Sequence, residues 1–474
     1  MTTMRMTALD GGPVEVSERA LTVLADRLAG EVLRPGEPGF ADAVTIWNGM
    51  ITKRPAVVVQ PVCDDDVCEA VRFARANGVL LSVKGGGHNV AGTSLADGGL
   101  TIDMSRIRSV DVDPRRRLAR VGGGCVLGDV DRATQAHGLA TVLGSNSGTG
   151  VAGLSLGGGF GYLSRRFGLA IDNLEAVEIV TADGQVRRAA ADENADLFWA
   201  VRGGGGNFGV ITRFTFRLHR VGPDITGGLM MWDAERADKV LALFRDLVEA
   251  ASRELALMVV LRSVPAVPFV PAPYHGKPGI ALNICHSGDP ARAARDLAPI
   301  KALRPLADVV GPRTYVDQQS ILDPMQPKGL HSYWKTEFLP RLSDGMVGAV
   351  RAHVTGHTSP LSLVLLQHLG GAVMDVAADA TAFATREAEC AFVVAGTWEP
   401  DDPEPDRHRE WVRAAWGAMR PYAIGNYVNG QMDDEDETRL REAYGDNWER
   451  LAKIKAVYDP ENLFRSNRNI APVS

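Results

Sequence analysis

The feature that most constrains the fold of this chain is a set of glycine runs that leave stretches of backbone without side chains. Gly85–Gly87 follow an apolar segment and come directly before His88, and a second run occupies residues 148–161. Bare backbone of this kind lets N–H groups close on a ligand. The two runs together indicate a large phosphorylated cofactor that lies across exposed main chain, with His88 at its reactive end.

A third run, Gly203–Gly206, lies between Trp199 and Phe208 and precedes an apolar segment that is typical of a strand. A flexible loop is the simplest interpretation of four consecutive glycines. The large aromatic residues on both sides favour an ordered turn at a ligand or at a contact between subdomains.

Composition limits the classes of function. At 474 residues and 45% hydrophobic content, the chain is long enough for two domains, or for one domain with a large insertion, around a full core. A net charge of −7 argues against non-specific binding to nucleic acid or to an anionic membrane surface. No apolar stretch approaches the roughly 20 residues of a membrane span. We therefore expect neither a nucleic-acid nor a membrane partner.

The cysteines and histidines indicate no metal site. The five cysteines are scattered and odd in number, which fits a reducing cytoplasm better than a disulfide framework. The histidines show no metal-binding spacing of the HxH or HExxH kind. No apolar signal segment follows the N-terminus, so we expect a cytoplasmic protein.

The order of predicted elements indicates an α+β fold. Strands over 55–60 and 79–84 flank a helix over 64–77, and short strands and many glycines follow. Gly222-Pro223 marks a boundary, after which strands alternate with long helices. That second part predicts one antiparallel sheet with helices covering one face. The predicted units are 1–45 (an N-terminal helical segment, with periodicity strongest over 14–33), 46–221 (a cofactor domain), 222–425 (a substrate domain) and 426–474 (a C-terminal segment).

The acidic run Asp433–Glu437 precedes a predicted helix over 438–444. Acidic residues suit the N-terminal turn of a helix, because its backbone dipole is positive there. We expect this run to be a solvated first turn.

A nicotinamide-binding Rossmann unit is the first alternative for the second glycine run. Residues 148–153 match the GxGxxG pattern, and Asp172 lies where a ribose-binding acid would be expected. However, Gly157–Gly159 would end the helix that this motif must open after about one turn. The pattern therefore favours a glycine-rich loop around a pyrophosphate.

Several motifs in order carry a resemblance to a known family. Residues 83–92 resemble the histidyl-flavin signature of FAD-linked oxidases of the berberine bridge enzyme type, which have a PCMH-type FAD-binding domain within the vanillyl-alcohol oxidase superfamily. Residues 150–161 and 202–209 resemble later motifs of the same FAD domain, and residues 427–470 resemble the family's C-terminal signature. The resemblance implies a two-subdomain FAD domain, an antiparallel-sheet substrate domain, and a tail that returns to the flavin.

By the same resemblance, His88 would be bonded covalently to the 8α-methyl group of FAD. Many relatives carry a second bond from a cysteine, but Asn146 or Ser147 stands at the matching place and Cys125 lies too far upstream. We therefore expect one covalent bond and no cysteinyl bond. The implied cofactor-binding positions are His88, Val83, Lys84, Gly85, Gly86, Gly87, Asn89, Gly92, Gly148, Thr149, Gly150, Val151, Gly153, Gly157, Gly158, Gly161, Val210, Tyr427 and Asn429.

The implied chemistry is hydride transfer from a substrate carbon to flavin N5, followed by reoxidation with O2 to give H2O2. The substrate would be a small or medium organic molecule, such as an alcohol, an amine or an intermediate of secondary metabolism. Candidates for the base that removes the substrate's O–H or N–H proton are Tyr427, Glu399 and Tyr333, while Asn429 would hydrogen-bond the flavin or the substrate. The alternatives are a flavin dehydrogenase with another electron acceptor and a catalytically silent flavoprotein.

Overall fold

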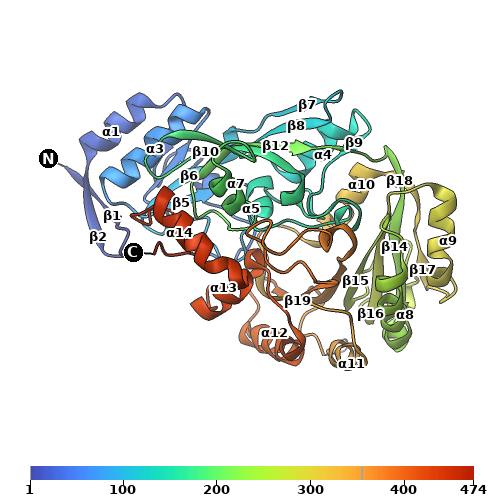
Figure 1. Ribbon diagram of the computed structural model, residues 1–474. Coiled ribbons are helices and arrows are strands. Elements are labelled where there is room, and N and C mark those ends of the chain that lie inside the picture. Colours follow the sequence, from blue (N-terminus) through green and yellow to red (C-terminus); the bar gives the residue numbers. More distant parts are fainter. Residues whose placement is uncertain (1, 354–355, 474) are drawn as a thin grey trace.

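A computed structural model describes residues 2–353 and 356–473 of the chain. Two lobes lie side by side, an N-terminal lobe coloured mainly blue to green and a second lobe coloured mainly light green to orange (Figure 1). The red C-terminal segment returns to the N-terminal lobe, where the Arg465 guanidinium donates to the carbonyl oxygen of Leu9 at 2.7 Å. No helix within the described ranges is both long and apolar enough to cross a membrane.

The first sheet of the N-terminal lobe runs in the order β3-β4-β6-β5, with β4 and β5 parallel to β6. Val57, Val58 and Val59 of β4 are fully buried, as expected for a parallel strand that is covered on both faces. Helix α3 connects β4 to β5, and the Asp66 carboxylate in its first turn accepts three backbone N–H groups. The elements are β3 (Glu31–Leu33), β4 (Val57–Gln60), α3 (Asp64–Ala76), β5 (Leu81–Lys84) and β6 (Leu100–Asp103).

The helix predicted over 14–33 is wrong for much of its length. Strands β1 (Thr3–Thr7) and β2 (Pro13–Ser17) form a hairpin, and helix α1 extends only over Glu18–Arg27. The Ser17 hydroxyl accepts from the backbone N–H of Ala20 and so caps the helix at that point. Valines at alternate positions before Ser17 fit a strand as well as a helix, which explains the error.

The second sheet of the N-terminal lobe is antiparallel and runs in the order β11-β10-β12-β8-β7. Phe198, Trp199, Phe214 and Phe216 fill the core between this sheet and its helices. The elements are β7 (Val110–Asp113), β8 (Leu118–Gly122), α4 (Leu127–Gln135), β9 (Leu139–Ala140), α5 (Val151–Leu156), α6 (Ser164–Phe167), β10 (Leu174–Val180), β11 (Val186–Ala190), α7 (Ala195–Val201), β12 (Val210–Arg217) and β13 (His219–Arg220).

The second lobe confirms the prediction of an antiparallel sheet with helices on one face. Its strands run in the order β17-β14-β16-β15-β20-β21-β19, and helices α8, α9, α11 and α12 pack on one side through residues such as Phe244 and Trp411 (Figure 1). The elements are β14 (Asp224–Asp233), α8 (Ala237–Ala250), β15 (Leu255–Ser263), β16 (Pro278–His286), α9 (Pro290–Lys301), β17 (Ala307–Asp308), β18 (Gly311–Thr314), α10 (Tyr315–Gln319), β19 (His331–Leu339), α11 (Asp344–Ala352), β20 (Leu363–His368), β21 (Cys390–Trp398) and α12 (Asp406–Met419).

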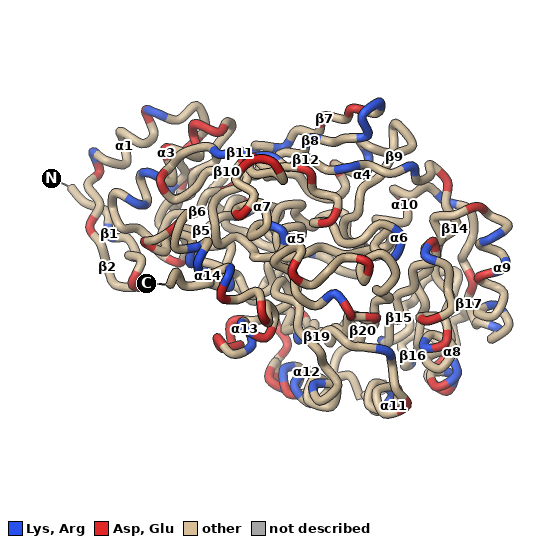
Figure 2. Tube along the Cα trace, viewed as in Figure 1, with Lys and Arg blue, Asp and Glu red and all other residues tan. Residues whose placement is uncertain are grey.

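Two long strands of this sheet, β14 and β19, were not predicted. Gly227 and Gly228 interrupt the apolar pattern of β14, and Lys335 and Glu337 interrupt that of β19. Charged residues of both signs lie along the outer helices, as along α12, so the net negative charge is not gathered on one helix (Figure 2).

The C-terminal segment adds helices α13 (Glu437–Tyr444) and α14 (Trp448–Tyr458) to the N-terminal lobe. The fully buried Lys455 ammonium donates to the carbonyl oxygens of Asn207 and Phe464 and to the carboxylate of Asp459. These bonds join the tail to the end of the third glycine run.

The first two glycine runs lie directly against each other. A methyl group added at Gly86 would overlap the backbone nitrogen of Gly150, and one added at Gly150 would overlap that of Gly86. Helix α5 begins after Gly150 and ends at Gly157, as the glycine content of this run predicts. The contact therefore joins the turn that carries His88 to the start of α5.

We expect Gly86→Ala to destabilise the N-terminal lobe by about 1–3 kcal/mol, because its methyl group cannot enter the contact with Gly150 without moving backbone. Gly153→Ala is the matched control, since an added methyl group there meets no heavy atom within 4 Å. The measurement is the urea midpoint of unfolding of the two variants and the wild type. Equal midpoints for both variants would contradict the proposed role of the glycine contact.

Candidate functional site

A cavity of about 380 Å³ lies between the two lobes. One side is formed by the turn over Gly85–Gly87, the start of the second glycine run, Gly205 and Gly206, and part of the tail. The other side is formed by strands β15, β19, β20 and β21 of the large sheet of the second lobe, which we call the substrate sheet after the substrate domain predicted there. All three glycine runs of the sequence thus reach the same cavity.

His88 lines this cavity just after the glycine turn. Its imidazole stacks on the Trp47 indole, with ring centroids 5.2 Å apart and an angle of 21° between the planes. Burial, reinforced by the nearby Lys328 ammonium, lowers the pKa of His88 to about 4. The imidazole is therefore neutral at physiological pH and keeps a nitrogen lone pair.

Tyr427 and Asn429 of the tail lie on the same cavity. The Asn429 amide nitrogen donates to the Tyr427 hydroxyl at 2.9 Å and to the carbonyl oxygen of Gly153 at 3.0 Å. The Tyr427 ring packs against Phe160, with centroids 4.7 Å apart. Burial raises the pKa of Tyr427 to about 12, so its side chain is a neutral phenol at pH 7.

Most of the predicted cofactor-binding residues come together here. The cavity is lined by the predicted residues Val83, Gly85, Gly86, Gly87, His88, Asn89, Thr149, Gly150, Gly153, Val210, Tyr427 and Asn429.

The other predicted positions do not line the cavity. The buried Lys84 ammonium donates to the Ala43 carbonyl oxygen and to the Asp103 carboxylate. Gly157 leaves room for the Asn429 amide, which an added methyl group would overlap. The remaining predicted positions outside the lining are Gly92, Gly148, Val151, Gly158 and Gly161.

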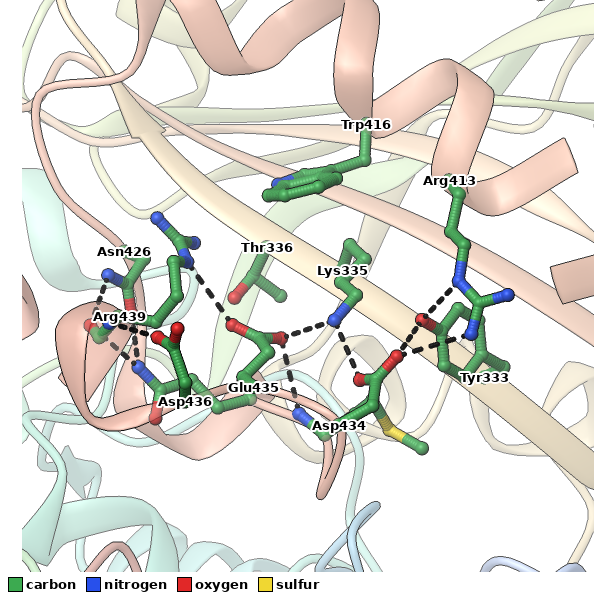
Figure 3. A network of polar contacts seen from close by, with 12 residues as sticks. Tyr333, Lys335, Thr336, Arg413, Trp416, Asn426, Asp434, Glu435, Asp436 and Arg439 are labelled. Atoms are coloured by element: carbon green, nitrogen blue, oxygen red, sulfur yellow. Dashed lines mark hydrogen bonds and ion pairs between the residues drawn. The ribbon is translucent and has the colours of Figure 1, made fainter. Parts of the chain in front are cut away.

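Two candidates for the catalytic base do not reach the cavity. Strand β19 alternates, so Trp334 and Thr336 face the cavity while Tyr333 faces helix α12. The Tyr333 hydroxyl donates to the Asp434 carboxylate at 2.5 Å and accepts from Arg413 (Figure 3). Glu399 is exposed just beyond the end of β21. The structure therefore places Tyr427 alone among the three candidates on the cavity.

The prediction that residues 433–437 form a solvated first turn is wrong in part: Asp434 and Glu435 come before the helix, and the Glu435 side chain is buried, while Asp434 stays partly exposed. The Lys335 ammonium donates to Asp434 at 2.8 Å and to Glu435 at 3.0 Å, and Arg439 bonds Glu435 from the other side (Figure 3). The helix begins only after Asp436, whose carboxylate caps it. The acidic run thus anchors the tail to the back of the substrate sheet.

Asp172 is not available to bind a ribose. Its carboxylate forms a two-point ion pair with the buried Arg386 guanidinium, at 2.7 and 2.9 Å. Helix α5, which would have to open a Rossmann unit, covers only Val151–Leu156. Both observations disfavour the nicotinamide alternative.

The cavity fits a long cofactor with many polar atoms. Ser94 Oγ, Tyr444 Oη and Asn467 Oδ1 belong to residues that line it, are shielded from solvent, and have no hydrogen-bond partner among the described residues. Buried polar atoms normally find partners. The glycine turns offer backbone N–H groups, and these three side chains offer further hydrogen-bonding atoms. Both kinds of partner suit the polar atoms of FAD.

Sequence reasoning missed several of these residues. Ser94, Asn207, Tyr444 and Asn467 line the cavity, yet none lies in the first two glycine runs. The third glycine run was a usable signal for Asn207, because this residue directly follows it. No local pattern marked Trp334, since its strand was not predicted.

Comparisons with known proteins agree with this site. Residues 55–190 match the family model described as "FAD binding domain", and residues 426–471 match the model described as "Berberine and berberine like". An FAD-linked oxidoreductase of Dictyostelium discoideum is 31% identical over 94% of this chain and 96% of its own length. (R)-6-hydroxynicotine oxidase of Paenarthrobacter nicotinovorans is 30% identical over 94% of this chain and 97% of its own length. The chain therefore belongs to the berberine bridge enzyme-like family of FAD-linked oxidoreductases.

Solved structures share the fold over nearly the whole chain. The crystal structure of 6-hydroxy-D-nicotine oxidase from Arthrobacter nicotinovorans superimposes with a TM-score of 0.83 at 27% identity, covering 94% of this chain and 98% of that one. BBE-like 1 of Physcomitrella patens gives a TM-score of 0.84 at 24% identity, covering 96% and 99%. The latter similarity bears on the fold alone.

The lowered pKa of His88 makes a prediction for stability. Between pH 6.5 and about 4 the unfolded chain binds a proton that the folded chain refuses, so folding stability falls as the pH drops through this window. The shift corresponds to about 3 kcal/mol. The free energy of unfolding, measured with urea on flavin-free protein, should therefore fall less between pH 7 and pH 4 for His88→Gln than for the wild type. We expect the difference between the two losses to reach up to this amount.

The exposed His137 provides the control, because His137→Gln should follow the wild type across the same pH range. Parallel curves for wild type and His88→Gln would show that the His88 imidazole is not held neutral by the fold.

Proposed function

We propose that this protein is an FAD-dependent oxidase with FAD attached covalently to His88. It oxidises a small or medium organic substrate, such as an alcohol, an amine or an intermediate of secondary metabolism, and O2 serves as electron acceptor and gives H2O2. The observation that carries the proposal is the neutral imidazole of His88 in one cavity with Tyr427, beneath a separate substrate sheet.

The attachment to His88 is supported by the chemistry of its surroundings. A covalent bond from a histidine requires an uncharged ring nitrogen, and burial keeps the His88 imidazole neutral while Trp47 holds its plane. Glucooligosaccharide oxidase from Acremonium strictum is described as carrying a 6-S-cysteinyl, 8α-N1-histidyl FAD. No cysteine lines the cavity within the described residues of this chain, so a single bond is proposed here.

Bound FAD would accept a hydride from the substrate carbon and pass two electrons to O2. In its phenolate form, Tyr427 is the group proposed to accept a hydrogen bond from the substrate's O–H or N–H and to take its proton, which regenerates the neutral phenol. The Asn429 amide orients the Tyr427 hydroxyl by donating to it, and its bond to Gly153 fixes the amide in turn. The glycine turns and the cavity atoms of Ser94, Tyr444 and Asn467 would hold the cofactor.

Covalent attachment is tested on a denaturing gel scanned for flavin fluorescence. We expect fluorescence to remain with the wild-type chain and to disappear from His88→Ala, because the mutant lacks the ring nitrogen that forms the bond. His137→Ala is the control and should keep the fluorescence. A yellow wild-type protein that releases all its flavin in acid would refute the linkage while leaving FAD in place.

Tyr427→Phe tests the proton acceptor. General base catalysis contributes about 10²–10⁴-fold, so we expect kcat of this variant to fall within that range. The raised pKa of Tyr427 means that phenolate increases with pH, so kcat/KM of the wild type should rise from pH 6 to pH 9 and that of the variant should not.

Tyr333→Phe is the matched control. This tyrosine faces away from the cavity, and Asp434 keeps its bonds to Lys335 and Arg413 without it, so kcat should stay within a few-fold of the wild type. Equal losses in the two phenylalanine variants would remove Tyr427 from the reaction. Peroxide formation in air, together with flavin bleaching by substrate without air, separates an oxidase from a dehydrogenase with another acceptor and from a silent flavoprotein.

A further inference from the structure

The wall of the cavity opposite the glycine turns is one face of four adjacent strands, β15, β20, β21 and β19. We call this wall the cavity floor. Its residues pair directly across the strands, as Leu365 pairs with Val393 and Ala395 with Trp334. The apolar members of the cavity floor are Met258, Leu363, Leu365, Val393, Ala395 and Trp334.

No charged side chain belongs to the cavity floor in the described part of the chain. The alternation of β19 sends Lys335 and Glu337 to the opposite face. Lys335 is bound there in an ion pair with Glu435 (Figure 3), and Glu337 in one with Arg439. Among the described lining residues of the whole cavity, Arg468 is the one arginine or lysine, and it belongs to the tail beside Asn467. An ionised substrate on the floor would lose its hydration and find no opposite charge there.

Gln367 is the exception on this apolar surface. It pairs with Met258 across β15 and β20, lines the cavity, and is 6% exposed. Its side-chain amide makes no hydrogen bond to any residue in the described ranges, although buried amides normally have partners. Thr336, the other polar member of the floor, already bonds the carbonyl oxygen of Tyr427.

We propose that the substrate is an uncharged, largely apolar molecule that lies on the cavity floor and hydrogen-bonds through one neutral polar group, such as a carbonyl, to the Gln367 amide. This inference rests on the proposed oxidase function and narrows its substrate class. Carboxylates are excluded by the lack of a positive charge on the floor. Oligosaccharides are excluded because their many hydroxyls would find too few partners among aliphatic side chains.

Three alcohols of similar shape test this inference: 4-acetylbenzyl alcohol, 4-isopropylbenzyl alcohol and 4-(hydroxymethyl)benzoate. Their para substituents are alike in size. The acetyl group offers a carbonyl, the isopropyl group has no polar atom, and the carboxylate carries a negative charge. Binding is followed by quenching of tryptophan fluorescence in the protein as isolated, with cellobiose as the polyhydroxyl probe. We expect both neutral probes to bind at least tenfold more tightly than the carboxylate and cellobiose, and the acetyl probe to bind most tightly.

Two variants assign the preference to named residues. Gln367→Leu should weaken the acetyl probe about tenfold and leave the isopropyl probe unchanged, because only the former loses a hydrogen bond. Leu365→Lys should reverse the preference towards the carboxylate, and Leu365→Met, which has similar volume and no charge, should keep the wild-type order.

Tighter or equal binding of the carboxylate or of cellobiose by the wild type, or no binding of either neutral probe, would overturn the inference. Flavin reduction is measured separately by absorbance. If the neutral probes bind as expected but no bound alcohol ever reduces the flavin, the substrate class stands and the oxidase proposal fails.

Discussion

The structure depends on the contact between two stretches of bare backbone, at Gly86 and Gly150. Because neither residue has a side chain, the turn after β5 can lie against the start of α5, and His88 is carried to the edge of the cavity. The third glycine run reaches the same cavity and is joined to the tail through Lys455. A cofactor site built in this way depends on the position of the main chain. We therefore expect substitutions to be tolerated poorly at the few glycines in close contact and as well as usual at other positions.

The tail completes the site by binding to both lobes. Asp434 and Glu435 bind Lys335 on the back of the substrate sheet, while Tyr427 and Asn429, a few residues earlier, lie on the cavity itself. The geometry of the proposed reaction centre is therefore set by both lobes together. Tyr427 receives its position from the tail, but the tail receives its position largely from β19.

Local patterns predicted His88 and the glycine turns, because bare backbone beside a histidine has its own physical reason, whereas Tyr427 and Asn429 were predicted from the resemblance of the tail to the family's C-terminal signature. The positions of the other candidate residues depend on burial and on contacts between residues that are distant in sequence. Tyr333 was chosen as a candidate base without knowledge of the strand that contains it, so its face could not be assigned. The sequence could not predict the ion pair of Asp434, because its partner, Lys335, is distant in sequence and is brought near only by the fold.

The alternation of β19 has a consequence for how this enzyme could diversify. Odd-numbered positions such as Tyr333 and Lys335 hold the tail, and even-numbered positions such as Trp334 and Thr336 face the cavity. Selection for a new substrate can therefore act on one set of side chains while the other set keeps the tail in place. The two faces of β19 thus have separate roles: one can change with the substrate, and the other keeps the tail attached to the sheet.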